Sequence, residues 1–147
     1  MICIISSAGG HLTEVQKATT LLNKQEKFYV TFSLPHIKES LVNEECYFVV
    51  DPHLNPFKYI LNFFQSLAIY IKKRPKVIIT TGAGIAIPMC VIGKCAGTKV
   101  IFIESGARVN KPSRTGRLLY PIADLFIVQW DSLLKYFPKA ICGGVLL

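Results

Sequence analysis

Two short segments of this sequence combine side chains that can bind an anion and move a proton. His11 ends the segment SSAGGH, directly after two glycines. Glu104 and Arg108 lie at the two ends of the segment ESGAR. Histidine and carboxylate side chains commonly exchange protons in catalysis, and arginine binds phosphates and carboxylates. The two segments together indicate a site for an anionic ligand whose reaction requires a proton acceptor.

The glycines before His11 support an anion site at the same place. Ile2 to Ile5 form an apolar run typical of a buried strand, and the residues after His11 have helical apolar spacing. Glycine lets the backbone of such a turn approach a ligand, and the free N–H groups of the helix attract phosphate. TTGAGIAIP is a second turn of this kind, and the predicted acceptor- and phosphate-binding residues are Ser7, Gly9, Gly10, Thr81, Gly82, Gly84 and Arg108. The alternative is that the glycines only make the turn and His11 only caps the helix.

Buried apolar runs alternate with helical segments along the chain. The runs are residues 2–5, 28–33, 46–50, 76–81, 100–105 and 125–130, and they lack the period of a half-exposed strand. Such runs are typical of a parallel sheet buried on both faces, which predicts one Rossmann-like α/β domain over residues 1–147. Ligands bind at the carboxyl ends of the strands in these sheets. We therefore expect the two glycine turns and the 104–117 loop to converge at one edge.

The composition excludes several classes of function. A formal charge of +8 favours anionic partners, but the basic stretches KKRPK and ARVNKPSRTGR lack interleaved aromatics, which argues against nucleic acid. The first turn lacks GxGxxG spacing, which argues against a dinucleotide-dependent enzyme. Five scattered cysteines without CxxC pairs indicate reduced core thiols in a cytoplasmic protein. We expect no metal, no cofactor and, because a strand begins at residue 2, no N-terminal leader or anchor.

A resemblance to a known family is carried by five segments, which are SSAGGHLTE, DPHLNP, RPKVIITTGAGIAIP, ESGARVNKPSRTG and LFIVQW. In this order they resemble polysaccharide-biosynthesis proteins similar to the membrane-recruiting subunit of the split N-acetylglucosaminyltransferase of dolichol-linked oligosaccharide assembly. The glycine turns also resemble those of the peptidoglycan lipid-linked N-acetylglucosaminyltransferase. The resemblance implies the acceptor-side half of a two-domain GT-B glycosyltransferase.

This resemblance implies a heterodimer in which a separate subunit binds the UDP-sugar. The acceptor would be a sugar on a polyprenyl pyrophosphate, in capsular polysaccharide, exopolysaccharide or lipid-linked oligosaccharide synthesis. The chain would be inactive alone and would recruit its partner to the cytoplasmic face of the membrane. The alternative is a scaffold that recruits and stabilises the catalytic partner without contributing chemistry.

Two side chains compete for the role of the base that takes the proton of the acceptor hydroxyl. His11 is the first candidate, because it lies at the mouth of the predicted cleft and imidazole exchanges protons near neutral pH. It can instead donate to the pyrophosphate or support the neighbouring loop. Glu104 is the second candidate, unless it only braces a loop. Glu14 ranks third, because its spacing is more typical of a helix cap.

Membrane attachment is expected from the helical segment NPFKYILNFFQSLAIYIKKRPK. We expect its apolar stripe to face the sheet, namely Phe57, Ile60, Leu61, Phe64, Leu67, Ala68 and Ile71. The predicted membrane-binding residues lie outside that stripe or at its basic end: Tyr59, Phe63, Tyr70, Lys72, Lys73 and Arg74. The fifteen residues from Phe57 to Ile71 would span about 22 Å as a helix, too short to cross a bilayer comfortably, so we expect a peripheral or monotopic attachment. The alternative is burial by the protein's own loops or by its partner.

The chain ends on the apolar segment CGGVLL, with no charged side chain after Lys139. An apolar end of this kind is typical of a contact surface, which gives Val145, Leu146 and Leu147 as predicted contacts with the partner subunit. The two preceding glycines would act as a hinge. The alternative is that the end folds back onto its own sheet or frays.

Overall fold

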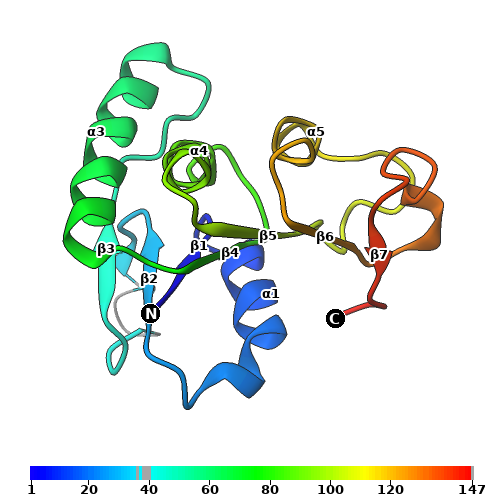
Figure 1. Cartoon of the computed structure of the whole chain (residues 1–147), viewed down its shortest axis with the longest axis horizontal. Helices are drawn as coiled ribbons and strands as arrows, with labels where there is room; N and C mark the ends of the chain where they lie inside the picture. The colour runs from blue at the N-terminus through cyan, green and yellow to red at the C-terminus, as the bar shows by residue number, and fades with distance from the viewer. Residues whose placement is uncertain (36, 38–40, 147) are drawn as a thin grey trace.

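One parallel sheet organises this protein. The structure is a computed structural model that describes residues 1–35, 37 and 41–146. Within these residues, seven strands run parallel in the order β3-β2-β1-β4-β5-β6-β7 (Figure 1). Their bounds are β1 Ile2–Ile5, β2 Lys27–Thr31, β3 Cys46–Phe48, β4 Val77–Thr80, β5 Lys99–Ile103, β6 Leu125–Val128 and β7 Ile141–Cys142. The predicted α/β fold is confirmed, and strands form at all six predicted runs.

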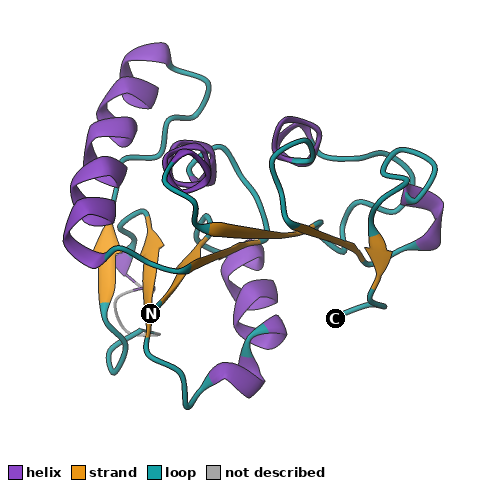
Figure 2. Cartoon of the chain, viewed as in Figure 1, coloured by secondary structure: helices purple, strands orange, loops and turns teal. Residues whose placement is uncertain are grey.

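Helices cover both faces of this sheet. They are α1 Gly10–Ala18, α3 Pro56–Lys73, α4 Ala86–Cys95 and α5 Arg114–Leu119, with short 3₁₀ turns η1 Thr20–Leu22 and η2 Asp131–Leu133. Helix α1 lies on one face, and α3, α4 and α5 lie on the other (Figures 1 and 2). Along β1, Cys3 and Ile5 join the core of the second face, whereas Ile4 joins that of the first. Burial on both faces explains why the strands are apolar without alternation.

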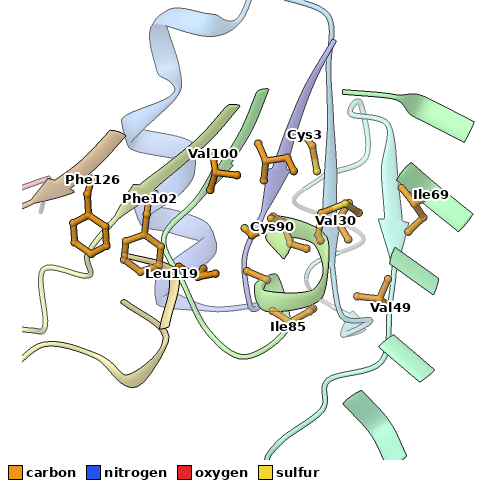
Figure 3. Close-up of a cluster of buried hydrophobic side chains, with 14 of the residues drawn as sticks. Cys3, Val30, Val49, Ile69, Ile85, Cys90, Val100, Phe102, Leu119 and Phe126 are labelled. Atoms are coloured by element: carbon orange, nitrogen blue, oxygen red, sulfur yellow. The ribbon is translucent and has the colours of Figure 1, made fainter. Parts of the chain in front are cut away.

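The larger core lies between the sheet and helices α3, α4 and α5. Figure 3 shows it extending across the sheet to the rings of Phe102 and Phe126, which stack with centroids 4.7 Å apart. Cys90 belongs to this core, and burial raises the pKa of its thiol to about 12, so the thiol stays protonated. Cys95 is exposed, so the prediction of core thiols does not hold for every cysteine.

The strand order brings three polar segments to the carboxyl edge of the sheet. Strand β1 lies at the centre, where Ile5 pairs with Thr80 of β4, and Thr80 pairs with Phe102 of β5. The turns that follow these strands therefore leave the sheet side by side. The strand order also reverses between β1 and β4, which is where open α/β sheets bind ligands. This topology confirms the predicted convergence of the two glycine turns and the 104–117 loop.

Helix α3 turns a polar face toward the sheet, contrary to the prediction. Asn62 and Ser66 are fully buried, whereas Phe57 and Phe64 of the predicted inner stripe are 81% and 61% exposed. The Asn62 amide donates to the carbonyl of Val50 at 2.8 Å, and its oxygen accepts from the Ser66 hydroxyl at 3.1 Å. Val50 follows the short strand β3, where buried backbone groups need partners. Because Asn62 supplies the partner of the Val50 carbonyl, the face of α3 that carries Asn62 lies against the sheet.

This orientation separates the aromatic residues that were predicted to contact a membrane. Tyr70 turns inward, and its hydroxyl oxygen is 2.6 Å from Oγ1 of Thr98. The Tyr59 hydroxyl lies against Gly84, where an added Cβ would be 2.5 Å away. Phe63 stays 39% exposed. The predicted outward placement of Tyr59 and Tyr70 is wrong, because the second glycine turn and the start of β5 offer these hydroxyls an interior surface.

The basic end of α3 is partly engaged within the protein. The Lys73 ammonium is 2.7 Å from a carboxylate oxygen of Glu45, and this hydrogen bond lowers the pKa of Glu45. The Lys72 ammonium lies 5.3 Å from the centroid of the Tyr47 ring. Arg74 ends the helix in the left-handed conformation and is exposed. Among the residues that the structure describes, no helix is both long and apolar enough to cross a bilayer.

Candidate functional site

A cavity of about 870 Å³ opens at the carboxyl edge of the sheet. His11 from α1 lines one side, Ala83 from the second glycine turn lines another, and residues from Ser105 to Arg117 complete it. The sequence predicted His11 and Arg108 at this place, and the structure brings both to the cavity. The cavity therefore lies where the loops after β1, β4 and β5 meet.

Four cationic side chains line this cavity, and they are Arg108, Lys111, Arg114 and Arg117. None of the described residues that line it is acidic. Within the described part of the chain, no ion pair involves any of these four side chains, and all four residues are exposed. Cations of one sign in a concave site raise the local concentration of anions. The cavity is therefore suited to a ligand with several negative charges.

Sequence reasoning identified one of these four cations and missed Lys111, Arg114 and Arg117. The signal was present, because the stretch ARVNKPSRTGR was recognised as densely basic. The stretch did not reveal that the chain turns at Ser113, where helix α5 begins. Ser113 caps α5 by accepting from the N–H of Gly116 at 2.8 Å, so the basic residues on both sides of the cap face one cavity.

The His11 ring is held at the mouth of the cavity. Its side chain is 34% exposed, but its Nδ1 atom is buried and has no hydrogen-bond partner among the described residues. The exposed part of the ring is therefore the Nε2 side. The backbone carbonyl of His11 accepts from the Thr81 hydroxyl at 2.8 Å. Thr81 is thus a brace between the two glycine turns, and this contact replaces its predicted role as a ligand group.

The glycines of the two turns differ in their availability to a ligand. Gly82 adopts a φ of 104°, and its N–H donates to Oγ1 of Thr80 at 2.9 Å, so this N–H is already used. Gly9 and Gly10 are exposed at the start of α1 and have open space at their Cα atoms. Gly82 was predicted to offer its N–H to the acceptor, and the bond to Thr80 occupies that N–H instead.

Ser7 and Gly84 lie in a second, smaller cavity of about 330 Å³. Asp51, His53 and Tyr59 also line it, and it shares Ala83 with the cationic cavity. The prediction grouped Ser7 and Gly84 with Arg108 as residues that bind the acceptor or its phosphates. The structure places these residues in two adjoining cavities that share Ala83, and their contact with one acceptor stays a prediction.

Glu104 does not occupy a position suited to a catalytic base. The residue is fully buried, and it does not line the cationic cavity. Its Oε1 accepts from the N–H of Ser105 at 3.1 Å, and its Oε2 accepts from both the N–H and the hydroxyl of Ser113 at 3.0 Å. Both oxygens thus hold the loop that carries the cations. Of the two interpretations of Glu104, the structure favours the loop brace.

Glu14 also braces this loop, instead of capping its own helix. Helix α1 has no side-chain cap, whereas Oε1 of Glu14 accepts from the N–H of Gly106 at 2.8 Å and the hydroxyl of Ser105 at 3.2 Å. The indole N–H of Trp130 donates to the carbonyl of Gly106 at 2.8 Å. The capping prediction is wrong, because this glutamate points across the sheet edge to the loop after β5.

The end of the chain packs in part onto its own sheet. The N–H of Leu146 donates to Oε1 of Gln129 at 2.9 Å, and its side chain joins the core on the α1 face. Val145 is 46% exposed. Leu147 lies outside the described residues. For Leu146 the structure therefore agrees with the fold-back alternative, while Val145 remains available at the surface.

Comparison with known proteins assigns the family. The family described as "Oligosaccharide biosynthesis protein Alg14 like" matches residues 49–146, about two thirds of the chain. The chain belongs to this family. Among curated relatives, the UDP-N-acetylglucosamine transferase subunit ALG14 of Candida albicans is 43% identical over 95 residues, and that of Homo sapiens is 28% identical over 94. Each match covers 60% of this chain. It covers 43% of the Candida albicans relative and 44% of the human relative, which is less than half of each.

Solved structures confirm the fold of this Alg14-like chain. MurG of Acinetobacter baumannii superposes with a TM-score of 0.74 at 15% identity, over 89% of this chain and 42% of that one. The UDP-N-acetylglucosamine 2-epimerase of Rickettsia bellii superposes with a TM-score of 0.79 at 11% identity, over 99% and 44%. At these identities the likeness concerns the fold alone. It agrees with the prediction of a Rossmann-like layer equivalent to one half of a GT-B protein.

Proposed function

We propose that this chain is the acceptor-binding subunit of a two-chain glycosyltransferase. In this reaction a sugar moves from a UDP-sugar to a sugar carried on a polyprenyl pyrophosphate. The cationic cavity beside His11 is the observation that carries the proposal, because its four cations make no ion pair with any described residue and can attract a doubly charged head group. The names of the curated relatives, each a subunit of a UDP-N-acetylglucosamine transferase, supply the reaction class.

Different groups of the cavity bind the acceptor and accept its proton. The exposed N–H groups at the start of α1 and the guanidinium groups of Arg108 and Arg114 bind the pyrophosphate. The acceptor hydroxyl then forms a bond to the anomeric carbon as the bond from that carbon to UDP breaks. Nε2 of His11 takes the hydroxyl proton. The UDP-sugar itself lies on the partner subunit, so the chain is inactive alone.

The exposed apolar surface of α3 is the proposed membrane contact. Its members are Phe57, Ile60, Leu61, Phe63, Phe64 and Ile71, which we call the α3 apolar surface. Figure 1 shows the first turns of α3 extending beyond the sheet. An apolar groove of about 320 Å³ between α3 and α4 adjoins this surface. An exposed apolar surface of this kind on one helix, with Lys72 and Arg74 at its end, is typical of interfacial attachment. The protein would then act as a peripheral or monotopic subunit at the cytoplasmic face.

The partner subunit is proposed to contact the end of the chain. Val145 is exposed, and Ile141 is 57% exposed on the edge strand β7, so an apolar strip borders the open side of the sheet. Leu146 is excluded from this contact, since it packs onto the chain's own core. A variant with Val145→Ser and Ile141→Ser should bind the donor-binding subunit more weakly without a change in melting temperature.

The acceptor site is tested by measuring transfer with the reconstituted pair of subunits. Arg114→Ala should raise the acceptor KM by about tenfold or more, because a charge-assisted contact to phosphate is lost. Lys24→Ala is the matched control, since this exposed lysine does not line the cavity. An unchanged acceptor KM in Arg114→Ala and in Arg108→Ala would contradict the proposed pyrophosphate site.

Binding can also be followed without activity. Trp130 is the single tryptophan of the sequence and donates to the loop that lines the cavity, so its fluorescence should report inorganic pyrophosphate binding. Affinity should fall steeply with salt. The scaffold alternative makes a different prediction for His11→Ala, which would then assemble with the partner on membranes and transfer sugar at the normal rate. Loss of transfer with intact assembly supports a chemical role.

A further inference from the structure

Two buried polar atoms near the mouth of the cationic cavity lack hydrogen-bond partners among the described residues. They are Nδ1 of His11 and Oε2 of Glu14, and they lie 3.8 Å apart. This separation exceeds the roughly 2.7–3.2 Å of an N–H···O hydrogen bond. Buried polar groups in native proteins are nearly always bonded, so two such atoms facing each other need an explanation.

The Glu14 carboxylate and the His11 backbone are both held in place by neighbouring loops. The second oxygen of Glu14 is fixed by the N–H of Gly106 and the hydroxyl of Ser105, which hold the carboxylate in place. The backbone of His11 is fixed through its carbonyl by the Thr81 hydroxyl. The two residues are three positions apart in the first turns of α1, so their side chains lie on the same face of the helix. A small rotation of the imidazole ring is the one movement needed to join them.

We propose that Glu14 is the positioning residue for His11. When the cavity is filled, Oε2 of Glu14 accepts a hydrogen bond from Nδ1–H of His11. This bond fixes the tautomer in which Nε2, on the cavity side, carries no proton and can accept one. Contacts of this kind are often long in the unliganded enzyme and shorten when substrate binds. The inference rests on the proposed function, in which His11 takes the proton of the acceptor hydroxyl.

The charges around the ring are consistent with this arrangement. Arg108, Lys111, Arg114 and Arg117 line the cavity on the Nε2 side, and Glu14 lies on the Nδ1 side. When Nε2 receives the proton, the ring becomes a cation between these four charges and one buried carboxylate. Glu14 lies where it can stabilise that cation, and the bound anion offsets the four positive charges.

The first test reads the tautomer of His11 directly by ¹⁵N NMR of the imidazole in the 147-residue chain with inorganic pyrophosphate bound. In the unaltered protein Nδ1 should carry the proton. In Glu14→Gln the amide N–H₂ replaces Oε2, so the proton should move to Nε2. Glu26→Gln is the matched control, because it makes the same chemical change at an exposed glutamate. An identical tautomer in the unaltered protein and Glu14→Gln would overturn the inference, whatever the activity.

The second test measures transfer by the reconstituted pair of subunits. Glu14→Gln retains an oxygen that can accept from Gly106, so its melting temperature and acceptor KM should change little. Its kcat should fall by about 10- to 100-fold. In a His11→Ala background Glu14→Gln should have no further effect, and an equal additional loss there would overturn the inference. If His11→Ala leaves kcat unchanged while the tautomer still depends on Glu14, the proposed base role fails and the positioning of the ring stands.

Discussion

Helices α1 and α3 both bury polar side chains, but they differ in what they leave outside. In α1 the apolar Val15 is buried together with Glu14, which holds the loop after β5. In α3 the buried Asn62 holds the segment after β3, while Phe57 and Phe64 are exposed. The apolar residues of α1 are used in the fold, whereas most of those of α3 are not. In both helices the buried polar side chain bonds the backbone of a distant segment. The exposed apolar side chains of α3 form the surface that we propose as a membrane contact.

The largest expected effect tests whether the exposed apolar residues of α3 bind a membrane. The double substitution Phe57→Ser and Phe64→Ser should weaken binding to anionic liposomes by about 3–6 kcal/mol, because two large apolar side chains no longer enter the interface. Flotation of the protein with liposomes measures this loss. Tyr70→Phe is the control on the same helix and should float normally, since Tyr70 faces Thr98. High salt should weaken binding only in part. Unchanged flotation of the double variant would show that α3 does not attach the protein to the membrane.

The next effect tests which face of α3 is buried, with one substitution at each of two adjacent positions. Asn62→Leu should lower the free energy of unfolding by about 2–3 kcal/mol, because the carbonyl of Val50 and the Ser66 hydroxyl lose their partner. Leu61→Asn should change it by less than about 0.5 kcal/mol, because Leu61 is half exposed. Urea denaturation of both variants measures the difference. A chain destabilised more by Leu61→Asn would show that the predicted stripe faces the sheet after all.

The smallest effect concerns Asp124, a partly exposed carboxylate that provides a reference for the buried Glu14. Two hydrogen bonds hold the pKa of Asp124 well below its usual range. The larger effect comes from the N–H of Val100, and the second from the ammonium of Lys94. A carboxylate whose pKa is lower in the folded state stabilises the fold above its unfolded pKa of about 3.9. That stabilisation disappears as the pH falls toward the folded-state pKa.

Asp124→Asn should therefore lower the melting temperature by a few degrees at pH 7, where the carboxylate is charged and bonded. The difference from the unaltered protein should shrink steadily between about pH 5 and pH 2. Thermal melts across this range measure it. A difference that stays constant with pH would mean that packing, and not the charge of Asp124, accounts for the effect.

The sequence was sufficient to predict the fold and the edge of the sheet at which the cationic cavity lies. Strands buried on both faces leave continuous apolar runs, and the glycine turns mark where those runs end, so the sheet edge with His11 and Arg108 could be predicted. The local chemistry of Glu104 could not be predicted. A carboxylate at a strand end can face a ligand or a loop, and only the position of Ser113, nine residues later, decides between them.

The orientation of α3 shows a second limit. Helical spacing identifies an apolar face, and an aqueous protein normally turns that face inward. Here the inward face is instead chosen by Asn62 and Ser66, whose partners lie in the segment after β3, far from the helix in sequence. A pattern within one helix contains no information about such partners. The same reasoning explains why Tyr59 and Tyr70 were placed outside.

The central position of β1 has a consequence for how the chain folds. Ile2 to Ile5 pair with residues of β4 that lie about 75 positions later, and the Thr81 hydroxyl that anchors His11 follows directly after them. Pairings over such sequence separations are slow to form, because a long loop must close first. On the ribosome, β1 must wait for this pairing until β4 has been synthesised and has left the exit tunnel. The histidine turn is thus translated well before β4, yet it reaches its final conformation only after β4 and Thr81 have emerged.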